Sequence, residues 1–436
     1  MLFRSAAPSE VAVSEPTQAE GAPPPEAQAQ APAAPAQGQA AQAQPQAAAP
    51  QNENTQISVS RGFANWMAQN RCSLAFTSYQ TGKLFLVGLT GDRKVSFHQQ
   101  NYQRAMGIHA QSDRLYVGSL FQIWRLENVL QPNERANQHF DRLFVPRNAQ
   151  TVGDVDVHEL GVDRAGRIIF VNTKFSCLAT VSQKYGFRPI WKPEFISKLA
   201  AEDRCHLNGL AMHDGLPKYV TAVSRSDVLN GWRERRHEGG VLIDVQNDKI
   251  VTDQLSMPHS PRVAANGQVY ALDSGRGHLI RIDPQTGKKE DIAFCPGFLR
   301  GLTLHNGFAI VTSSLPRDGT FQGLELQEAL KKRDGDPWCG IMVINLNSGD
   351  IVEFIRCKEN EEKKAWALID AGYDGSFTGV AYGSVFFQNS NNSVRVTDDF
   401  MRAVLDDGPW TTKAVVNGQP VDTYKARDLK IGRAHV

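Results

Sequence analysis

Apolar and polar residues alternate in short stretches between about Ser73 and Cys357, and one pattern recurs. Each copy has a polar start, a glycine or its equivalent, an apolar pair, a turn, and a strand of β-branched or aromatic residues. Alternation with a period of two predicts half-buried β-strands. The copies are RAMGIHAQSDRLYVGS, HELGVDRAGRIIFVNT, HLNGLAMHDGLPKYVTAVS, HSPRVAANGQVYALDS and FLRGLTLHNGFAIVTSS, which start at Arg104, His158, His206, His259 and Phe298.

Turn residues divide each copy into a hairpin. The turns are Ser-Asp, Ala-Gly, Asp-Gly, Asn-Gly and Asn-Gly, and glycine and asparagine tolerate the positive φ that tight turns require. Further strand pairs lie between the copies, for example GGVLIDVQNDKIVTD and HLIRIDPQTGKKEDI. Four strands per repeat predict the blades of an all-β fold, the β-propeller. We predict six blades, with five and seven left open, and only two short helices, at residues 64–68 and from Leu324.

Composition divides the chain of 436 residues into segments. Residues 6–52 contain no aromatic residue, no Lys and no Arg, but nine of the 22 prolines. Such a segment cannot bury enough apolar surface to fold, so we predict a disordered Ala/Pro/Gln-rich linker over 1–55 and a propeller over 60–357.

Both ends have an artificial appearance. Residues 1–5 and 431–436 resemble translated sequencing adapter, and we expect them to be sequencing artefacts. The reading frame is then cut at both ends, and an upstream domain can have been lost by truncation. Residues 358–430 are expected to be either a chimeric join or a closing segment of the propeller.

Charge and hydropathy exclude some partners. The formal net charge is +1 and no basic stripe is present, which argues against nucleic acid. No apolar run approaches the ~20 residues that span a bilayer, so no membrane partner is expected. The six cysteines lie far apart in the sequence, and no CxxC motif is present. This spacing is typical of cysteines buried as small apolar residues, and not of a zinc site or a disulfide framework. A reducing, cytoplasmic location is expected.

Several motifs resemble an uncharacterised bacterial β-propeller family known only as conserved hypothetical proteins. They include SLAFTSYQTGKLFLVGL, DVDVHELGVD, DRCHLNGLAM, GWRERRHEGGVLID and FCPGFLRGL, and the resemblance covers about residues 73–355. It implies a propeller and no activity. From Lys358 onward the sequence departs from the family.

A weaker likeness connects HLNGLAMHDG to gluconolactonase and senescence-marker propellers. Those enzymes use an Asn-Gly at the start of an inner strand as a metal ligand, which implies a ligand-binding role for Asn208. The next copy has Pro261-Arg262 where those enzymes carry Asp-Gly, so the likeness implies nothing beyond Asn208.

Three successive copies place histidine at one register, as His158, His206 and His259. Equivalent residues of innermost strands surround the axis of a propeller, so we expect these imidazoles near one mouth of the channel. Three histidines suit a divalent transition metal with an open position, which would acidify a bound water. The alternative is a polar channel lining that binds ordered water.

Carboxylates and arginines lie next to this register. Asp156 and Glu159 are candidates for orienting a histidine or for acting as general base, and an exposed Asp face is the alternative. Asp203-Arg204 is expected to be a structural ion pair. Candidate ligand-binding residues beside Asn208 are Arg104 at the histidine register, Arg262 and Arg300 just beyond it, and Trp232 with Arg233 in a long polar loop. For Arg262 and Arg300, salt bridges between blades are the alternative.

The sequence therefore names no reaction and leaves three functions open. The first is a module that binds a small anionic or polar ligand, or a peptide, at the channel mouth. The second is a metal-dependent hydrolase or lyase that uses the three histidines. The third is a scaffold for protein interactions.

Overall fold

The structure is a computed structural model, and it describes residues 56–316, 320–321, 323–358, 367–369, 413–416 and 419–422. The predicted disordered linker over 1–55, both predicted artefact segments and most of 358–430 lie outside the described residues.

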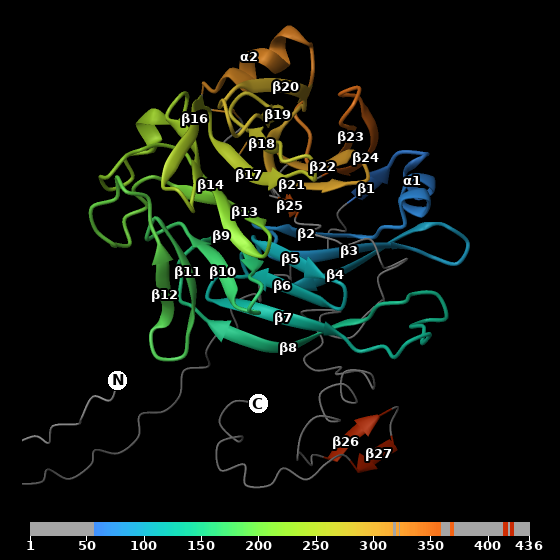
Figure 1. The fold of residues 1–436 in the computed structure, drawn as a ribbon. Helices are drawn as coiled ribbons and strands as arrows, with labels where there is room; N and C mark the ends of the chain where they lie inside the picture. Colours follow the sequence, from blue (N-terminus) through green and yellow to red (C-terminus); the bar gives the residue numbers. More distant parts are fainter. Residues whose placement is uncertain are drawn as a thin grey trace, which may run out of the picture. The chain divides into compact units, whose positions relative to one another are not determined.

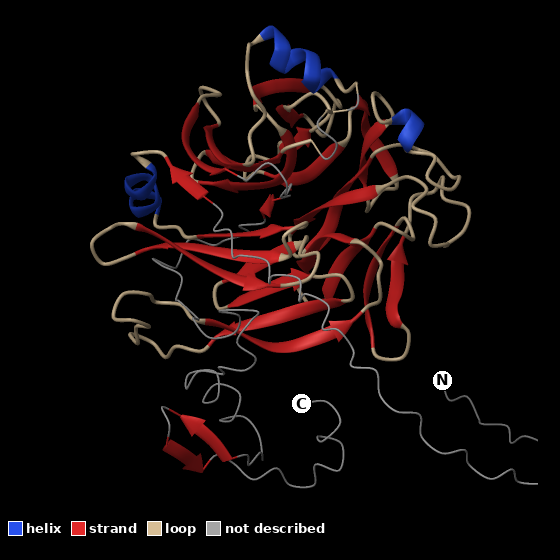
Figure 2. Cartoon of the chain, turned by 180° about the vertical axis from the view of Figure 1, so that it is seen from behind, coloured by secondary structure: helices blue, strands red, loops and turns tan. Residues whose placement is uncertain are grey.

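Six antiparallel sheets make up a six-bladed propeller, which confirms the predicted fold class. Figure 1 shows the innermost strands of the blades grouped around the middle of the ring, and Figure 2 shows how few helices accompany them. In blades 2 to 5 the strands run outward from the axis in chain order. These strands are β5 (Ile108–Gln111), β6 (Arg114–Gly118), β7 (Gln122–Asn128) and β8 (Phe144–Thr151); β9 (Val157–Val162), β10 (Ile168–Asn172), β11 (Cys177–Ser182) and β12 (Gly186–Trp191); β13 (Leu207–His213), β14 (Leu216–Ala222), β15 (Gly240–Asp244) and β16 (Lys249–Leu255); and β17 (Pro258–Val263), β18 (Val269–Asp273), β19 (His278–Ile282) and β20 (Lys289–Phe294).

The first and last blades are built from segments far apart in the sequence. In blade 1, β25 lies on the inner side of β2. In blade 6, β1 pairs with β24 along the outer edge and makes a fifth strand. The strands are β2 (Leu74–Ser78), β3 (Lys83–Leu89), β4 (Val95–Asn101) and β25 (Ala367–Ile369) in blade 1, and β21 (Phe298–His305), β22 (Phe308–Ser314), β23 (Gly340–Asn345), β24 (Ile351–Lys358) and β1 (Gln56–Val59) in blade 6.

The turns follow the sequence signals. Asp214 and Gly215 have φ of 50° and 67°, and Asn306 and Gly307 have 47° and 80°, so two of the five predicted turns place both residues in the left-handed region. The two predicted helices are present, as α1 (Phe63–Asn70) and α2 (Glu325–Lys332), with a short 3₁₀ turn, η1 (Arg233–Arg235). The strands β26 (Lys413–Val416) and β27 (Gln419–Asp422) pair with each other as a hairpin.

The glycine at the repeat register has a packing role. A Cβ on Gly107 would lie 3.0 Å from the backbone of Glu159 in the next blade, and one on Gly209 would lie 2.4 Å from Pro261. Neighbouring inner strands approach closely near the axis, and only a residue without a side chain leaves that space. This close approach explains why the repeat keeps glycine there.

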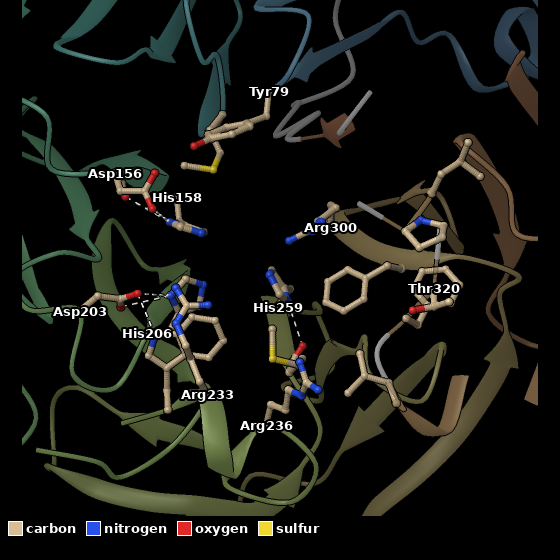
Figure 3. Close-up of a pocket in the computed structure, with 18 residues that line it drawn as sticks. Tyr79, Asp156, His158, Asp203, His206, Arg233, Arg236, His259, Arg300 and Thr320 are labelled. Atoms are coloured by element: carbon tan, nitrogen blue, oxygen red, sulfur yellow. Dashed lines mark hydrogen bonds and ion pairs between the residues drawn. The ribbon is translucent and has the colours of Figure 1, made fainter. Parts of the chain in front are cut away.

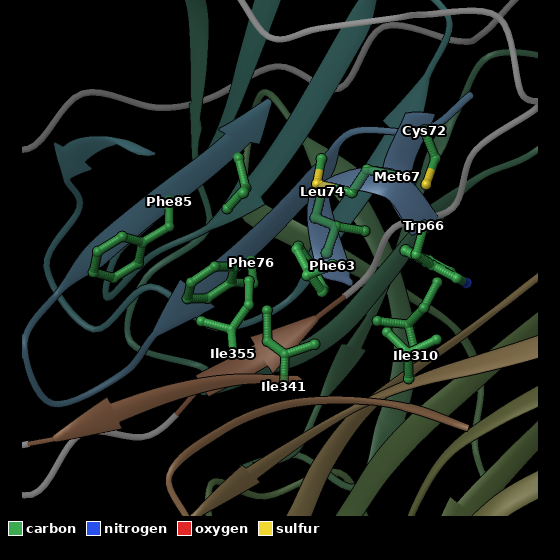
Figure 4. Close-up of a cluster of buried hydrophobic side chains, with 12 residues drawn as sticks. Phe63, Trp66, Met67, Cys72, Leu74, Phe76, Phe85, Ile310, Ile341 and Ile355 are labelled. Atoms are coloured by element: carbon green, nitrogen blue, oxygen red, sulfur yellow. The ribbon is translucent and has the colours of Figure 1, made fainter. Parts of the chain in front are cut away.

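Blades 1 and 6 share one apolar cluster that α1 covers. Phe63, Trp66 and Met67 of the helix pack with Phe76 of blade 1 and Ile341 of blade 6 (Figure 4). Burial of these large side chains stabilises the junction where the ring closes.

None of the six cysteines, all in the described part of the chain, forms a disulfide, and five are buried. Among the helices that the structure describes, none is long and apolar enough to cross a membrane.

Candidate functional site

A cavity of about 470 Å³ lies at the end of the ring where the inner strands begin. All six blades contribute to its wall, through Tyr79, Met106, His158, His206, His259 and Phe298 in chain order. The loop around η1 and the segment before α2 supply the remaining lining. Figure 3 shows the three histidines pointing into this space. The predicted meeting of the three imidazoles at one mouth thus corresponds to a single cavity.

His158 is held through its Nδ1 atom. This nitrogen lies 3.1 Å from the carbonyl oxygen of Asp156 and 2.7 Å from Oγ1 of Thr173. The Thr173 hydroxyl donates to the carbonyl oxygen of Leu207 at 2.6 Å, so its oxygen accepts from the ring. Nδ1 therefore carries the hydrogen. Burial lowers the pKa of His158 to about 4, which leaves the ring neutral near pH 7.

His259 repeats this arrangement two blades further on. Its Nδ1 lies 2.8 Å from the carbonyl oxygen of Met257 and 3.2 Å from Oγ of Ser274. Burial, and then the positive charge of Arg300, hold the pKa of His259 well below its usual value. Met257 and Asp156 have φ of 48° and 55°, and at both places this backbone accompanies a carbonyl that meets the ring two residues on.

His206 is held by a carboxylate. Its Nδ1 lies 2.9 Å from Oδ2 of Asp203, and the indole N–H of Trp232 donates to the same oxygen at 2.8 Å. The imidazole stacks on the Trp232 ring at 4.2 Å and meets the ring of His158 edge-on at 4.9 Å between centroids. Burial alone would raise the pKa of Asp203, but His206, His158 and Trp232 together hold it below its usual value.

The predicted Asp203–Arg204 ion pair is wrong. Arg204 contacts Oε2 of Glu202 at 2.7 Å and Oδ1 of Asp227 at 2.6 Å instead. The left-handed backbone of Asp203, with φ of 43°, separates the directions of these adjacent side chains. Asp203 therefore belongs to the cavity and Arg204 to the loop behind it.

No three His, Cys, Asp or Glu side chains of the described residues come close enough to hold one metal ion. The predicted transition-metal site at His158, His206 and His259 therefore stays a prediction. The three rings share the cavity, but the geometry does not bring them together as a ligand set.

The cavity wall carries three arginines. Arg300 is 8% exposed, lies over the Phe298 ring at 4.2 Å, and donates to Oγ of Ser314 at 3.4 Å. Figure 3 shows it reaching toward His259. Arg233 and Arg236 come from the η1 loop, and the guanidinium of Arg233 lies 4.5 Å from the Trp232 ring centroid. Among the predicted binding residues, Arg300, Trp232 and Arg233 line the cavity.

Glu159 and Arg262 do not line this cavity. They form an ion pair with each other inside the ring, and Glu159 also accepts the backbone N–H of Leu210 at 2.6 Å. Glu159 follows His158 directly, and adjacent side chains of a strand point to opposite faces. The structure therefore places Asp156 at the cavity and Glu159 between blades, and the acid or base role of Asp156 stays a prediction.

Arg104 and Asn208 lie beside the cavity without lining it. Arg104 donates to Oδ1 of Asp156 at 2.9 Å and lies over the Tyr79 ring at 5.1 Å. Asn208 is 2% exposed and accepts a hydrogen bond from Thr221 at 2.7 Å. Arg104 thus supports Asp156, and Asn208 joins the two inner strands of its blade.

Sequence reasoning missed the side chains that fix the histidines. Thr173 and Ser274 stand at the ends of outgoing strands, where small polar residues read as turn caps. Each lies 15 residues after the histidine that it contacts. This constant interval was a usable signal, because each histidine and its partner lie on paired strands of one hairpin. Phe321 and Leu324, which also line the cavity, carry no such signal.

Part of the chain is similar to ribonucleotide reductases. The family model "Ribonucleotide reductase, barrel domain" matches residues 330–429. The vitamin B12-dependent ribonucleotide reductase of Rhodopirellula baltica is 50% identical over 82 residues, which are 18% of this chain and 8% of that protein. That of Streptomyces coelicolor is 39% identical over 89 residues, 20% of this chain and 9% of that protein. The chain thus spans less than a tenth of these relatives.

Solved structures and a second family model match the propeller. A structure of a nidogen/laminin complex has a TM-score of 0.43 at 11% identity and covers 69% of this chain and 99% of its own. Virginiamycin B lyase from Staphylococcus aureus has a TM-score of 0.35 at 9% identity, with 70% and 100% covered. The second family model spans residues 61–363, close to the range over which the motifs resembled an uncharacterised propeller family. The chain belongs to the family described as "Domain of unknown function (DUF4915)".

Proposed function

We propose that this protein binds a small anionic ligand in the cavity at the channel mouth, with Arg300 as the main charge partner. The observation that carries the proposal is a guanidinium only 8% exposed in the wall of a cavity. Guanidinium groups match carboxylates and phosphates through paired hydrogen bonds.

The charges around the cavity support an anion. The two carboxylates of the wall have partners: Asp156 accepts from Arg104, and Asp203 accepts from His206 and Trp232. Arginines 233, 236 and 300 supply the opposite sign. The described residues of the wall thus include three arginines against two carboxylates, and an excess of one sign of charge in a cleft attracts ligands of the other sign.

Size and polarity favour a small ligand with an apolar part. The volume of about 470 Å³ lies in the range of small-molecule sites. Met257, Phe298, Phe321 and Leu324 form an apolar region of the wall. A carboxylate or phosphate on a compact apolar body would satisfy both sides of the cavity.

Calorimetry with a charged probe and its neutral analogue tests the charge requirement. We expect 3-phenylpropanoate or succinate to bind, and the corresponding amides to bind at least tenfold more weakly. Arg300→Gln removes the charge and is expected to abolish the difference. Arg281→Gln is the control, because Arg281 pairs with Glu290 on the exposed outer part of blade 5. Equal binding of acids and amides, or unchanged binding by Arg300→Gln, would overturn the proposal.

A metal ion held by the three histidines is a second candidate, and it requires the rings to move closer together than the described geometry places them. The observation that favours it is the shared anchoring of Nδ1, which leaves Nε2 of each ring as the metal-binding nitrogen. Elemental analysis of the purified protein tests it. Stoichiometric transition metal that disappears when all three histidines are changed to Ala would support this candidate. No metal in the wild type, or metal that survives the triple change, would remove it.

A further inference from the structure

The three cavity histidines share one hydrogen-bonding pattern at Nδ1. Their Nδ1 atoms face the carbonyl oxygen of Asp156, the carboxylate of Asp203 and the carbonyl oxygen of Met257, at 3.1, 2.9 and 2.8 Å. Carbonyl and carboxylate oxygens only accept hydrogen bonds, so each Nδ1 must donate. In a neutral imidazole the other nitrogen, Nε2, is then a hydrogen-bond acceptor.

His259 shows this acceptor most directly. The residue is 2% exposed, and its Nε2 is buried without a hydrogen-bond partner among the residues that the structure describes. The ring lines the cavity and lies edge-on to Phe298 at 5.7 Å, with Arg300 beside it (Figure 3). A buried acceptor without a donor is unfavourable, so the site is built for a donor that a ligand brings.

The neighbours of His259 do not supply such a donor. Phe298 and Met257 have apolar side chains, and no N–H or O–H of the described residues donates to Nε2 of His259. The positive charge of Arg300 also disfavours a proton on the ring. Burial acts in the same direction on His158, whose pKa falls to about 4. Near pH 7 both histidines therefore face the cavity as acceptors, next to a cation that attracts an anion.

We propose that the ligand is a hydroxy or amino acid anion: Arg300 binds its acidic group, and the Nε2 atoms of His259 and His158 accept hydrogen bonds from its hydroxyl or amine groups. This inference rests on the proposed function and specifies the class of ligand. It separates the roles of the two sides of the cavity. The arginine selects for charge, and the histidines weaken the binding of an acid of the same shape that has no donor. A site that leaves a buried polar group unpaired discriminates strongly against the ligand that lacks its partner.

Matched pairs of acids test the inference on the full chain. The pairs are 3-phenyllactate with 3-phenylpropanoate, malate with succinate, and lactate with propanoate, and the members of each pair differ by one hydroxyl group. We expect at least one hydroxy acid to bind tenfold or more tightly than its partner in calorimetry, with a chelator present to exclude metal-mediated binding. A loss of that preference on adding chelator would assign the histidines to a metal and overturn the inference.

His259→Phe removes the acceptor and keeps a ring, and Phe298 already occupies the equivalent register of blade 6. We expect this variant to bind both members of a pair equally. His213→Phe is the matched control. His213 is half-exposed at the C-terminal end of β13, so this variant should keep the preference. A preference that survives in His259→Phe would overturn the inference.

Nitrogen NMR of the histidine side chains gives a readout on the unaltered protein, whether or not the variant folds. We expect three rings with hydrogen on Nδ1, and an Nε2 resonance that shifts with the hydroxy acid and not with its partner. Equal binding of all pairs would overturn this inference while the anionic-ligand proposal stands. Binding of none of these acids at millimolar concentration would count against both.

Discussion

Glu159 lies one residue beyond His158, and that step turns its side chain from the cavity into the ring. There it meets Arg262, which comes from a strand two blades away in the sequence. Both residues were candidates for the functional site. The side chains of Glu159 and Arg262 are 6% and 15% exposed, so each of these largely buried charges is stabilised by the opposite charge of the other. At the residue scale, strand alternation decides which titratable groups a ligand can meet.

Glu159→Gln tests this assignment. The change leaves the Arg262 guanidinium without its counter-charge, and we expect a loss of about 3 kcal/mol or more in the free energy of unfolding. Urea denaturation measures it. The double variant Glu159→Gln/Arg262→Met should recover much of the loss, and binding of anionic probes should stay unchanged in both. A variant of normal stability that no longer binds would instead place Glu159 in the site.

Buried neutral histidines predict a specific pH dependence of stability. Burial lowers the pKa of His98, His109 and His158 to about 4, against about 6.5 in an unfolded chain. Below about pH 6.5 the unfolded chain takes up protons that the folded chain refuses. The contribution of these histidines to the free energy of unfolding is therefore fully present above about pH 6.5 and is lost as the pH falls toward 4.

His98→Asn isolates one of these groups. We expect the stability difference between pH 7 and pH 4.5 to shrink by about 2 to 3 kcal/mol relative to wild type, as denaturation at the two pH values would show. An unchanged difference would mean that His98 takes up its proton in the folded state.

At the scale of elements, the ends of the ring differ from its middle. The repeat pattern predicted blades 2 to 5 because each is a continuous stretch of four alternating strands. The strand β1 was not predicted, since QISV is short and isolated from any repeat. Its position follows from the exposed edge of β24, which β1 covers, and from Ile57 and Val59, which pack against the cluster under α1.

Removal of β1 is expected to weaken blade 6. A chain that begins at Ser60 would lose two packed side chains, worth about 2 to 3 kcal/mol, and would expose the β24 edge to pairing with other chains. We expect a lower melting temperature and concentration-dependent aggregation by light scattering. A chain that begins at Asn54 keeps β1 and is the control. Equal behaviour of the two truncations would show that β1 contributes little.

At the scale of the whole molecule, the matches to two family models overlap over residues 330–363. The propeller family spans residues 61–363, and the ribonucleotide reductase barrel spans 330–429. The propeller family match ends at residue 363 while the similarity to the reductases continues, so we propose that the segment after Lys358 is a chimeric join. The alternative is a closing segment, since β25 pairs with β2.

Truncation after Lys358 distinguishes the two. For a join, we expect the melting temperature to change by no more than about 2 °C, because the segment would contribute little to ring stability. If the segment is a closing strand, its removal uncovers the inner edge of β2, and we expect a clear fall in the melting temperature. Differential scanning calorimetry measures the melting temperatures of the full chain, of the chain that ends at Lys358 and, for comparison, of the chain that begins at Asn54.

The sequence by itself determined the propeller, its six blades, the tight turns and the register that brings the three histidines to one mouth. These features depend on local alternation, on glycine and asparagine at turns, and on spacing, all of which lie within one blade. Tertiary structure alone decided that Asp203 holds His206, that Trp232 stacks on it, and that Glu159 pairs with Arg262. Those contacts depend on side-chain direction and on loops that cross between blades, and neither is encoded in the period of the repeat.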